Sequence, residues 1–276
     1  MEKTFDFILL SILTIVIFFI GIKLSSDSRD NYYVGLKDLN YYEKFSQKKI
    51  ISGLINNNIL LNPPNKKNRI LFITYDNRYN QEYVMIHNYN INKYVEKYGY
   101  EYKFYNRCND NVYWCKIFMV LDSIKKNNWD YVVWLDSDTV IKNFNIDFGK
   151  ILNKFSSDIF IGSDNNPNLD ITNAGVFAIK NSPIGIQFLN DCVEYVSNKC
   201  LNQDGSLKGV WAGTCYEQGV MNVLIADKYK DYTTILTNDI IFNYNVCSDD
   251  VFIMHLYASS PNYRVRCFNS KNPALR

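Results

Sequence analysis

Short apolar runs alternate with segments of helical periodicity along most of this 276-residue chain, and that alternation restricts the fold more than any other feature. Runs typical of strands are at residues 70–74, 100–105, 131–135, 159–161, 175–179 and 251–255. Helical spacing is found at 82–98, 116–126, 183–196 and 218–226, and Gly99 is placed to cap the first of these. The pattern predicts an α/β, Rossmann-like domain with a mainly parallel sheet, helices on both faces and ligands at the carboxyl ends of the strands.

Two acidic residues come directly after the apolar run 131–135. Asp136 and Asp138 flank Ser137, and carboxylates at this spacing in a tight turn can converge on one hard cation. Mg²⁺ or Mn²⁺ in such a place neutralises the charge that develops on a leaving diphosphate. A bare Asp-x-Asp is more often a solvated loop, but the buried strand that leads into this one favours a metal site.

The same strand also fits a second class of enzyme. Residues 133–140 match the nucleophile strand of haloacid-dehalogenase-like phosphotransferases, in which Asp136 would be phosphorylated. In those enzymes the motif opens the domain and an acidic GDxxxD element follows it. Here the motif lies well inside the domain, and Asp249-Asp250 is the one candidate acidic pair downstream. A phosphatase with Asp136 as nucleophile therefore stays as an alternative.

Other motifs precede and follow the acidic pair. They are, in chain order, residues 69–74, 98–100, 114–116, 134–138, 173–175, 217–218 and His255. In this order they resemble glycosyltransferase family 34, the galactosyl-, mannosyl- and xylosyltransferases of the GT-A fold with a DxD motif. The resemblance spans about residues 68–268, and it rests on the ordered set because no single piece is specific.

The resemblance implies a metal site made by Asp136, Asp138 and His255, with Mn²⁺ or Mg²⁺ as the cofactor. Asp138 would be the firmer ligand, and Asp136 would also reach the ribose. A strand-end histidine such as His255 can instead be a hydrogen-bonded structural residue. His87, the other histidine of the chain, has no partner motif, and we interpret it as structural.

The resemblance also implies positions for the donor and for the reacting groups. The nucleotide- and donor-binding set would be Thr74, Tyr75, Asp76, Lys116, Asp136, Ser137, Asn173, Ala174, Gly175 and Arg264. Lys116 could equally be an exposed residue at a helix start, and Gly175 would let the backbone approach the sugar closely. The catalytic set would be Gln218, Glu217 and Asp170. In it Gln218 positions groups and stabilises charge, Glu217 binds the sugar, and Asp170 belongs to the donor-sugar and acceptor loop.

Two positions depart from the family pattern. Tyr216 stands where family members commonly have an acidic residue, and Ser260 stands where they have a lysine. A positive group at the second position would stabilise the leaving diphosphate. Arg264 or Arg266 could substitute for it from the following turn.

An uncharged apolar segment at residues 7–22 predicts a membrane anchor. A helix of this length covers roughly 24 Å, a little less than the ~30 Å hydrocarbon core, and Lys3 and Lys23 can snorkel at its ends. We therefore expect a tail and signal-anchor at 1–22, a stem at 23–67 and the glycosyltransferase domain at 68–276. A cleaved signal peptide is the alternative.

The net charge and the cysteine spacing argue against a nucleic-acid-binding protein and against a structural zinc site. A net charge of +2 gives no footprint for nucleic acid. None of the seven cysteines forms a CxxC pair, so a structural zinc site is not expected. An oxidising compartment would permit disulfides with at least one thiol left over, but the pairing cannot be read from the sequence.

Together these features predict a metal-dependent, retaining glycosyltransferase. It would move a hexose or pentose from a nucleoside-diphosphate sugar, expected to be UDP-linked, to a glycan, glycoprotein or glycolipid. We expect a single-pass type II protein of the ER or Golgi with a lumenal catalytic domain, or one in a host membrane if the chain is viral. An inactive sugar-binding relative, with Tyr216 and Ser260 as signs of lost catalysis, is a further alternative.

Overall fold

The computed structural model describes residues 68–126, 128–164, 172–210 and 213–275. The helices are α3 (Glu82–Tyr98), α4 (Cys115–Lys126), α5 (Phe148–Leu152), α6 (Pro183–Lys199), α7 (Glu217–Leu224) and α8 (Pro261–Asn269). The strands are β1 (Ile70–Tyr75), β2 (Glu101–Tyr105), β3 (Tyr131–Leu135), β4 (Thr139–Ile141), β5 (Ile159–Ser163), β6 (Thr172–Lys180), β7 (Thr233–Leu236), β8 (Ile241–Asn243) and β9 (Ile253–His255). Every helix and strand expected from the sequence is present, and β4, α5, β7, β8 and α8 are additional.

The strands form two sheets. The larger has the order β2-β1-β3-β6-β5-β7, and the smaller has the order β4-β9-β8. β1 is parallel to β2 and β3, and β5 is parallel to β7. β6 runs antiparallel to both of its neighbours, β3 and β5. The expectation of a mainly parallel sheet therefore holds for the part of the sheet that carries the acidic turn.

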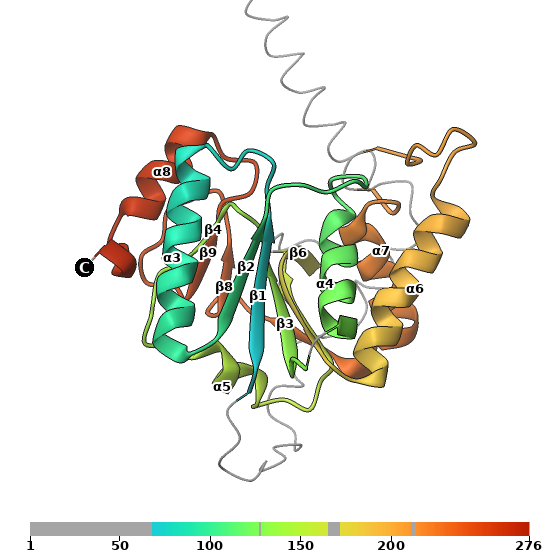
Figure 1. Cartoon of the computed structure of the whole chain (residues 1–276), viewed down its shortest axis with the longest axis horizontal. Coiled ribbons are helices and arrows are strands. Elements are labelled where there is room, and N and C mark those ends of the chain that lie inside the picture. The colour runs from blue at the N-terminus through green and yellow to red at the C-terminus, as the bar shows by residue number, and fades with distance from the viewer. Residues whose placement is uncertain (1–67, 127, 165–171, 211–212, 276) are drawn as a thin grey trace, which may run out of the picture.

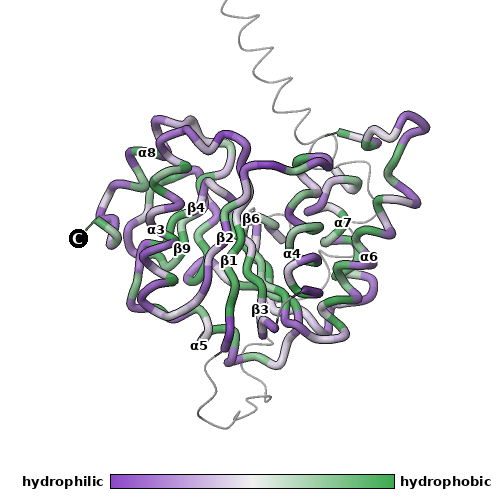
Figure 2. Tube along the Cα trace, in the orientation of Figure 1, coloured by the Kyte–Doolittle hydropathy of each residue, from purple (hydrophilic) through white to green (hydrophobic). Residues whose placement is uncertain are grey.

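Helices cover both faces of the larger sheet, as the alternation predicted (Figure 1). Leu71 and Ile73 of β1 point to one face and pack in a core with α4, α6 and α7. Ile70 and Phe72 point to the other face, where α3 and α5 pack. Because successive side chains of a strand alternate, a strand buried on both faces must be apolar throughout. Figure 2 shows this in the hydrophobic colour of β1 and β3.

A third core joins α3 to the smaller sheet. Val84 of α3 packs with Val140, Met254 and Phe268, which brings β4, β9 and α8 onto the far side of α3. Gly99 ends α3 in the left-handed conformation with φ 62°, and its N–H reaches back to Glu96 O, as the cap prediction required. The C-terminal segments are thereby fixed beside the elements that follow β1.

The parallel pairing of β1 with β3 decides where the site lies. Ile73 is paired with Trp134, so both strands end at the same edge of the sheet. The residues after β1 and the acidic turn after β3 consequently lie together, as expected for ligand sites in α/β sheets. Among the described residues no helix is long and apolar enough to cross a membrane. The predicted anchor at 7–22 and the stem lie outside those residues and remain predictions.

Candidate active site

The acidic turn is fixed by backbone hydrogen bonds on both sides. Asp136 N donates to Gly175 O at 2.7 Å, which ties the turn to β6, and Thr139 N donates to Asp136 O at 3.0 Å, which closes it. β4 then begins at Thr139 and pairs antiparallel with β9, so that Thr139 lies opposite His255. This pairing carries the distant histidine to the turn.

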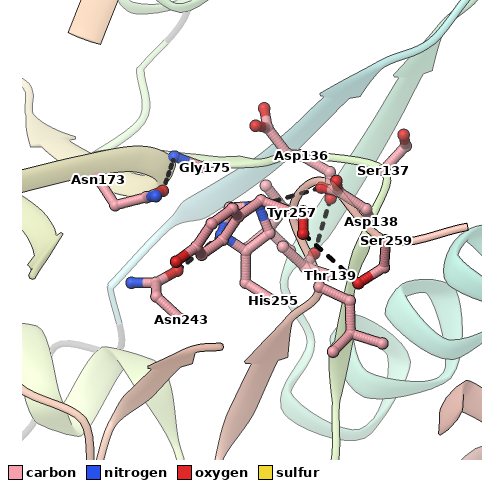
Figure 3. Close-up of polar contacts among 12 residues, drawn as sticks. Asp136, Ser137, Asp138, Thr139, Asn173, Gly175, Asn243, His255, Tyr257 and Ser259 are labelled. Carbon is pink, nitrogen blue, oxygen red and sulfur yellow. Dashed lines mark hydrogen bonds and ion pairs between the residues drawn. The ribbon is translucent and has the colours of Figure 1, made fainter. Parts of the chain in front are cut away.

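Asp136, Asp138 and His255 come together as the resemblance implied. One ligand atom from each lies within 4.8 Å of the other two. His255 Nε2 is 3.1 Å from Asp138 Oδ1, and Figure 3 shows the imidazole and the carboxylate facing each other. The sequence prediction that these three side chains form one cluster is confirmed.

Asn243 sets the orientation and the protonation of the imidazole. Its Nδ2 donates to Ser163 O at 2.7 Å, so its Oδ1 faces His255 Nδ1 at 2.6 Å. An amide oxygen only accepts, and therefore Nδ1 carries the hydrogen and Nε2 can present a lone pair. His255 Nε2 is buried and has no hydrogen-bond partner in the described part of the chain.

A divalent ion fits this arrangement. A lone pair and a carboxylate oxygen only 3.1 Å apart repel each other unless a proton or a cation lies between them. Neighbouring ligands of an octahedral ion with bonds of roughly 2.1 Å are themselves roughly 3 Å apart. One imidazole with two carboxylates suits Mn²⁺, and Mg²⁺ less well because it prefers oxygen.

Gly175 has a packing role that the sequence did not indicate. A Cβ built on it would lie 2.1 Å from His255 Cε1 and 2.7 Å from both ring nitrogens. The space over this residue is therefore filled by the imidazole, which by itself requires a glycine, and the expected approach of a sugar stays a prediction. The N–H of Gly175 donates to Asn173 Oδ1 at 2.8 Å.

Arg264 holds the second oxygen of Asp138. Its Nη2 donates to Asp138 Oδ2 at 2.8 Å and its Nε donates to Leu256 O at 3.1 Å. Burial would raise the pKa of Asp138, but a protonated His255 and the guanidinium of Arg264 outweigh it and hold that pKa well below the ordinary value. Of the two arginines considered at this turn, Arg266 is exposed and stacks on Tyr263, with 5.0 Å from its guanidinium carbon to the ring centroid.

Lys116 is buried at the start of α4 and is no exposed helix-end residue. Its Nζ lies 3.1 Å from Asp136 Oδ1, 3.0 Å from Glu217 Oε1 and 3.3 Å from Ala174 O. Burial opposes its charge, yet the two carboxylates prevail and raise its pKa above the ordinary value. Lys116 thus links the acidic turn to α7, while Trp134 Nε1 donates to the same carboxylate of Asp136 at 2.6 Å.

The predicted catalytic residues Glu217 and Gln218 begin α7 beside β6. Gln218 Oε1 accepts from Ala174 N at 3.0 Å. Glu217 is buried and paired with Lys116. The segment Asn173-Ala174-Gly175 therefore connects α7 to the acidic turn, and Asp170, the third predicted catalytic residue, lies outside the described residues.

The residues at the carboxyl end of β1 are buried or half-buried. Thr74 was expected in the nucleoside cradle, but it is fully buried and bonds His87 Nε2 at 2.9 Å and Leu135 O at 2.8 Å. Its side chain therefore supports the turn from behind, together with His87, whose predicted structural role is confirmed. Tyr75 is half-buried against the core on the α4 side, and Asp76 accepts a short hydrogen bond from Ser137 Oγ.

Both departures from the family pattern have local structural roles. Ser260 is the N-cap of α8, and its Oγ accepts from Tyr263 N at 3.4 Å. Tyr216 precedes α7, and its ring contacts that of Tyr113 edge to face with 5.0 Å between centroids.

Two residues near the turn were missed by the sequence interpretation. Asn243, which orients His255, stands among many asparagines and belongs to a strand of three residues. Arg78, which pairs with Asp76, is a polar residue of a loop. Neither has a spacing or a motif that distinguishes it; the one usable signal was that Arg78 is four residues after the predicted strand end at Thr74.

Comparison with known proteins gives the fold. No family model and no curated protein sequence matches the chain. Among solved structures it is similar to a glycosyltransferase involved in the glycosylation of the major capsid of PBCV-1, with a TM-score of 0.57 and 12% identity over 73% of this chain and 99% of that one. Two further glycosyltransferases, GlyE of Streptococcus pneumoniae TIGR4 and the bifunctional WbbM, align with TM-scores of 0.48 and 0.47 and identities of 14% and 12%.

These two alignments cover 74% and 77% of this chain but only 61% and 51% of the other proteins. The likeness to the first structure shows that the chain has the mixed α/β, parallel-rich fold of glycosyltransferase structures. Sequence identity this low supports an assignment of the fold but not of the substrate.

Proposed function

We propose that the protein is a metal-dependent glycosyltransferase that uses a nucleoside-diphosphate sugar. The observation that carries the proposal is the Asp138–His255 pair at the carboxyl edge of the sheet, in which the buried Nε2 makes no hydrogen bond to any described residue and lies 3.1 Å from a carboxylate oxygen. When bound there, Mn²⁺ would neutralise charge on the leaving diphosphate. Asp136, Asp138 and His255 would hold it.

The chain's own residues hold that site in shape before a donor arrives. Asn243 orients the imidazole, Arg264 orients Asp138, and Lys116 with Trp134 orients Asp136. Preorganisation of this kind reduces the reorganisation that the reaction would otherwise require.

A retaining reaction is part of the proposal. Glu217 is the carboxylate on the α7 side of the turn, and its ion pair with Lys116 makes it a weak nucleophile. We therefore assign Glu217 to sugar binding and Gln218, held by Ala174 N, to positioning at the anomeric carbon. The pair of free carboxylates that glycoside hydrolysis requires is not proposed here.

The family and the setting are proposed with the function. Family 34, a UDP-linked hexose or pentose and a glycan, glycoprotein or glycolipid acceptor are carried by the ordered motifs. Three disulfides, Cys108–Cys115, Cys200–Cys215 and Cys247–Cys267, support an oxidising compartment. A lumenal domain on an N-terminal anchor in the ER or Golgi, or in a host membrane, agrees with that chemistry.

The test is a panel of nucleotide sugars with and without Mn²⁺, read by thermal shift and by sugar release. A bound donor stabilises the folded state by mass action, so one donor should raise Tm only when Mn²⁺ is present. Asp138→Asn should abolish that shift and the release of sugar.

Two outcomes would contradict the proposal. Equal donor turnover in wild-type protein and Asp138→Asn would remove the metal assignment. Hydrolysis of a phosphate monoester that is lost in Asp136→Asn, with no donor bound, would favour the phosphatase alternative.

A further inference from the structure

Three cationic side chains surround the acidic turn, each paired with a carboxylate, and two of them are buried. Lys116 is buried between Asp136 and Glu217, and Arg264 is buried against Asp138. The third, Arg78, has a side chain that is 55% exposed. Of these three, it alone can meet a solute without a rearrangement of the site.

Arg78 is held rigidly in spite of its exposure. Its Nε and Nη2 donate to the two oxygens of Asp76 at 3.0 and 2.8 Å, and its backbone N donates to Oδ1 at 2.7 Å. Asp76 in turn accepts from Ser137 Oγ, the residue between the two metal-site aspartates. The guanidinium is thus connected to the acidic turn, while Nη1 makes no hydrogen bond within the described chain.

The ring of Tyr83 packs against both Arg78 and Arg264. The guanidinium carbons of the two arginines are 5.9 and 4.9 Å from the ring centroid of Tyr83. Tyr83 is 1% exposed, and its hydroxyl has no hydrogen-bond partner among the described residues. A buried hydroxyl without a partner, on a ring that packs against two cations, is costly in an apolar core but suits the edge of an anion site.

We propose that Arg78 binds the diphosphate of the donor and supplies the positive charge that Ser260 cannot. This inference rests on the proposed function and extends it to a residue that no motif indicated. A guanidinium can donate two parallel hydrogen bonds to phosphate oxygens. Because Asp76 already fixes the side chain, little further conformational entropy is lost when the anion binds.

A purely structural role for Arg78 makes different predictions. In that case Arg78 only neutralises the buried carboxylate of Asp76. Replacing Arg78 would then lower the stability of the fold and weaken uridine, UMP and UDP binding to the same extent. A diphosphate site instead predicts a loss that grows with the number of phosphates on the ligand. Binding of uridine, UMP and UDP to the same variant separates the two.

The experiment measures binding of UDP, UMP and uridine by isothermal titration calorimetry with saturating Mn²⁺. Arg78→Gln should weaken UDP binding roughly 10- to 100-fold, since a charged hydrogen bond contributes about 1.5–3 kcal/mol and 1.4 kcal/mol is tenfold. UMP should lose less affinity, and uridine should bind as before. If the protein selects guanine, the same titrations use GDP, GMP and guanosine in place of UDP, UMP and uridine.

Matched variants keep the result interpretable. Arg69→Gln removes the same charge from an arginine that stacks on Trp129 before β1, and it should leave UDP binding unchanged. In an Asp76→Asn background, Arg78→Gln leaves no unpaired buried carboxylate at residue 76. The double variant should therefore still bind UDP more weakly than Asp76→Asn alone.

The outcomes are distinct. If wild-type protein binds UDP or GDP with Mn²⁺ but Arg78→Gln binds them equally well, the inference is wrong and the proposed function stands. An equal loss for uridine and UDP would also overturn it, because that result indicates a structural role. If the wild type binds no nucleoside diphosphate, both proposals fall.

Discussion

At the scale of single residues, the site depends on how closely one imidazole packs on one glycine. The ring of His255 lies against the backbone of Gly175 and is held at Nδ1 by Asn243. The sequence gives the types of these residues but not their contacts, since His255 and Gly175 are distant along the chain. The packing of Gly175 on this histidine therefore could not be predicted from the sequence.

We predict that Gly175→Ala weakens Mn²⁺ binding at least tenfold and lowers the free energy of unfolding by about 1–3 kcal/mol through overpacking. The new methyl group would lie 2.1 Å from His255 Cε1, so the ring must move. Calorimetric Mn²⁺ titration and urea unfolding measure the two effects.

A double-mutant cycle provides the control. In a His255→Ala background the space over residue 175 is open, and Gly175→Ala should then cost little stability. An equal cost in both backgrounds would show that the imidazole does not explain the glycine.

At the scale of elements, each disulfide fixes a segment that carries a site residue. Cys108–Cys115 joins the loop before α4 to its first residue, next to Lys116. Cys200–Cys215 closes the segment that leads into Glu217, and Cys247–Cys267 ties the loop after β8 to α8, which carries Arg264. Loops closed in this way have less freedom in the unfolded chain.

Removing the second disulfide should separate stability from metal binding. For Cys200→Ser/Cys215→Ser we expect the free energy of unfolding to fall by about 3 kcal/mol, because the bridge spans 15 residues. Mn²⁺ affinity should not change, since Asp138 and His255 lie on other elements. Donor affinity should fall with the loss of order at Glu217. Unchanged unfolding in the double variant would contradict this account.

The length of a helix or strand decided whether it could be predicted from the sequence. Long periodic segments such as α3 were predicted at their observed bounds, because many residues contribute to one pattern. β4 and β8 have three residues each, too few for a period of two to be visible. β6 was predicted as a strand but not as antiparallel, since a strand buried on both faces is apolar in either direction.

At the scale of the whole molecule, His87 makes folding sensitive to acid. It is fully buried behind the acidic turn, and burial lowers its pKa to about 4. In the unfolded chain the pKa is about 6.5. Between these values the unfolded state binds the extra proton, so stability is complete above pH 6.5 and is lost as the pH falls toward 4.

The predicted loss between pH 7 and pH 5 is about 2 kcal/mol from this one group. Urea unfolding of wild-type protein and of His87→Gln at both pH values measures it. The variant should be less stable at pH 7 but should lose less on acidification. Equal losses in the two proteins would show that His87 is not buried as a neutral base.

The central claim is that Asp136, Asp138 and His255 bind Mn²⁺, and the most direct measurement is pulsed electron paramagnetic resonance of Mn²⁺ bound to tag-free protein. The account predicts nitrogen coupling from one imidazole, because one of the chain's two histidines belongs to the cluster. The coupling should vanish in His255→Gln and persist in His87→Gln. Absence of nitrogen coupling in the wild type, or its persistence in His255→Gln, would contradict the account.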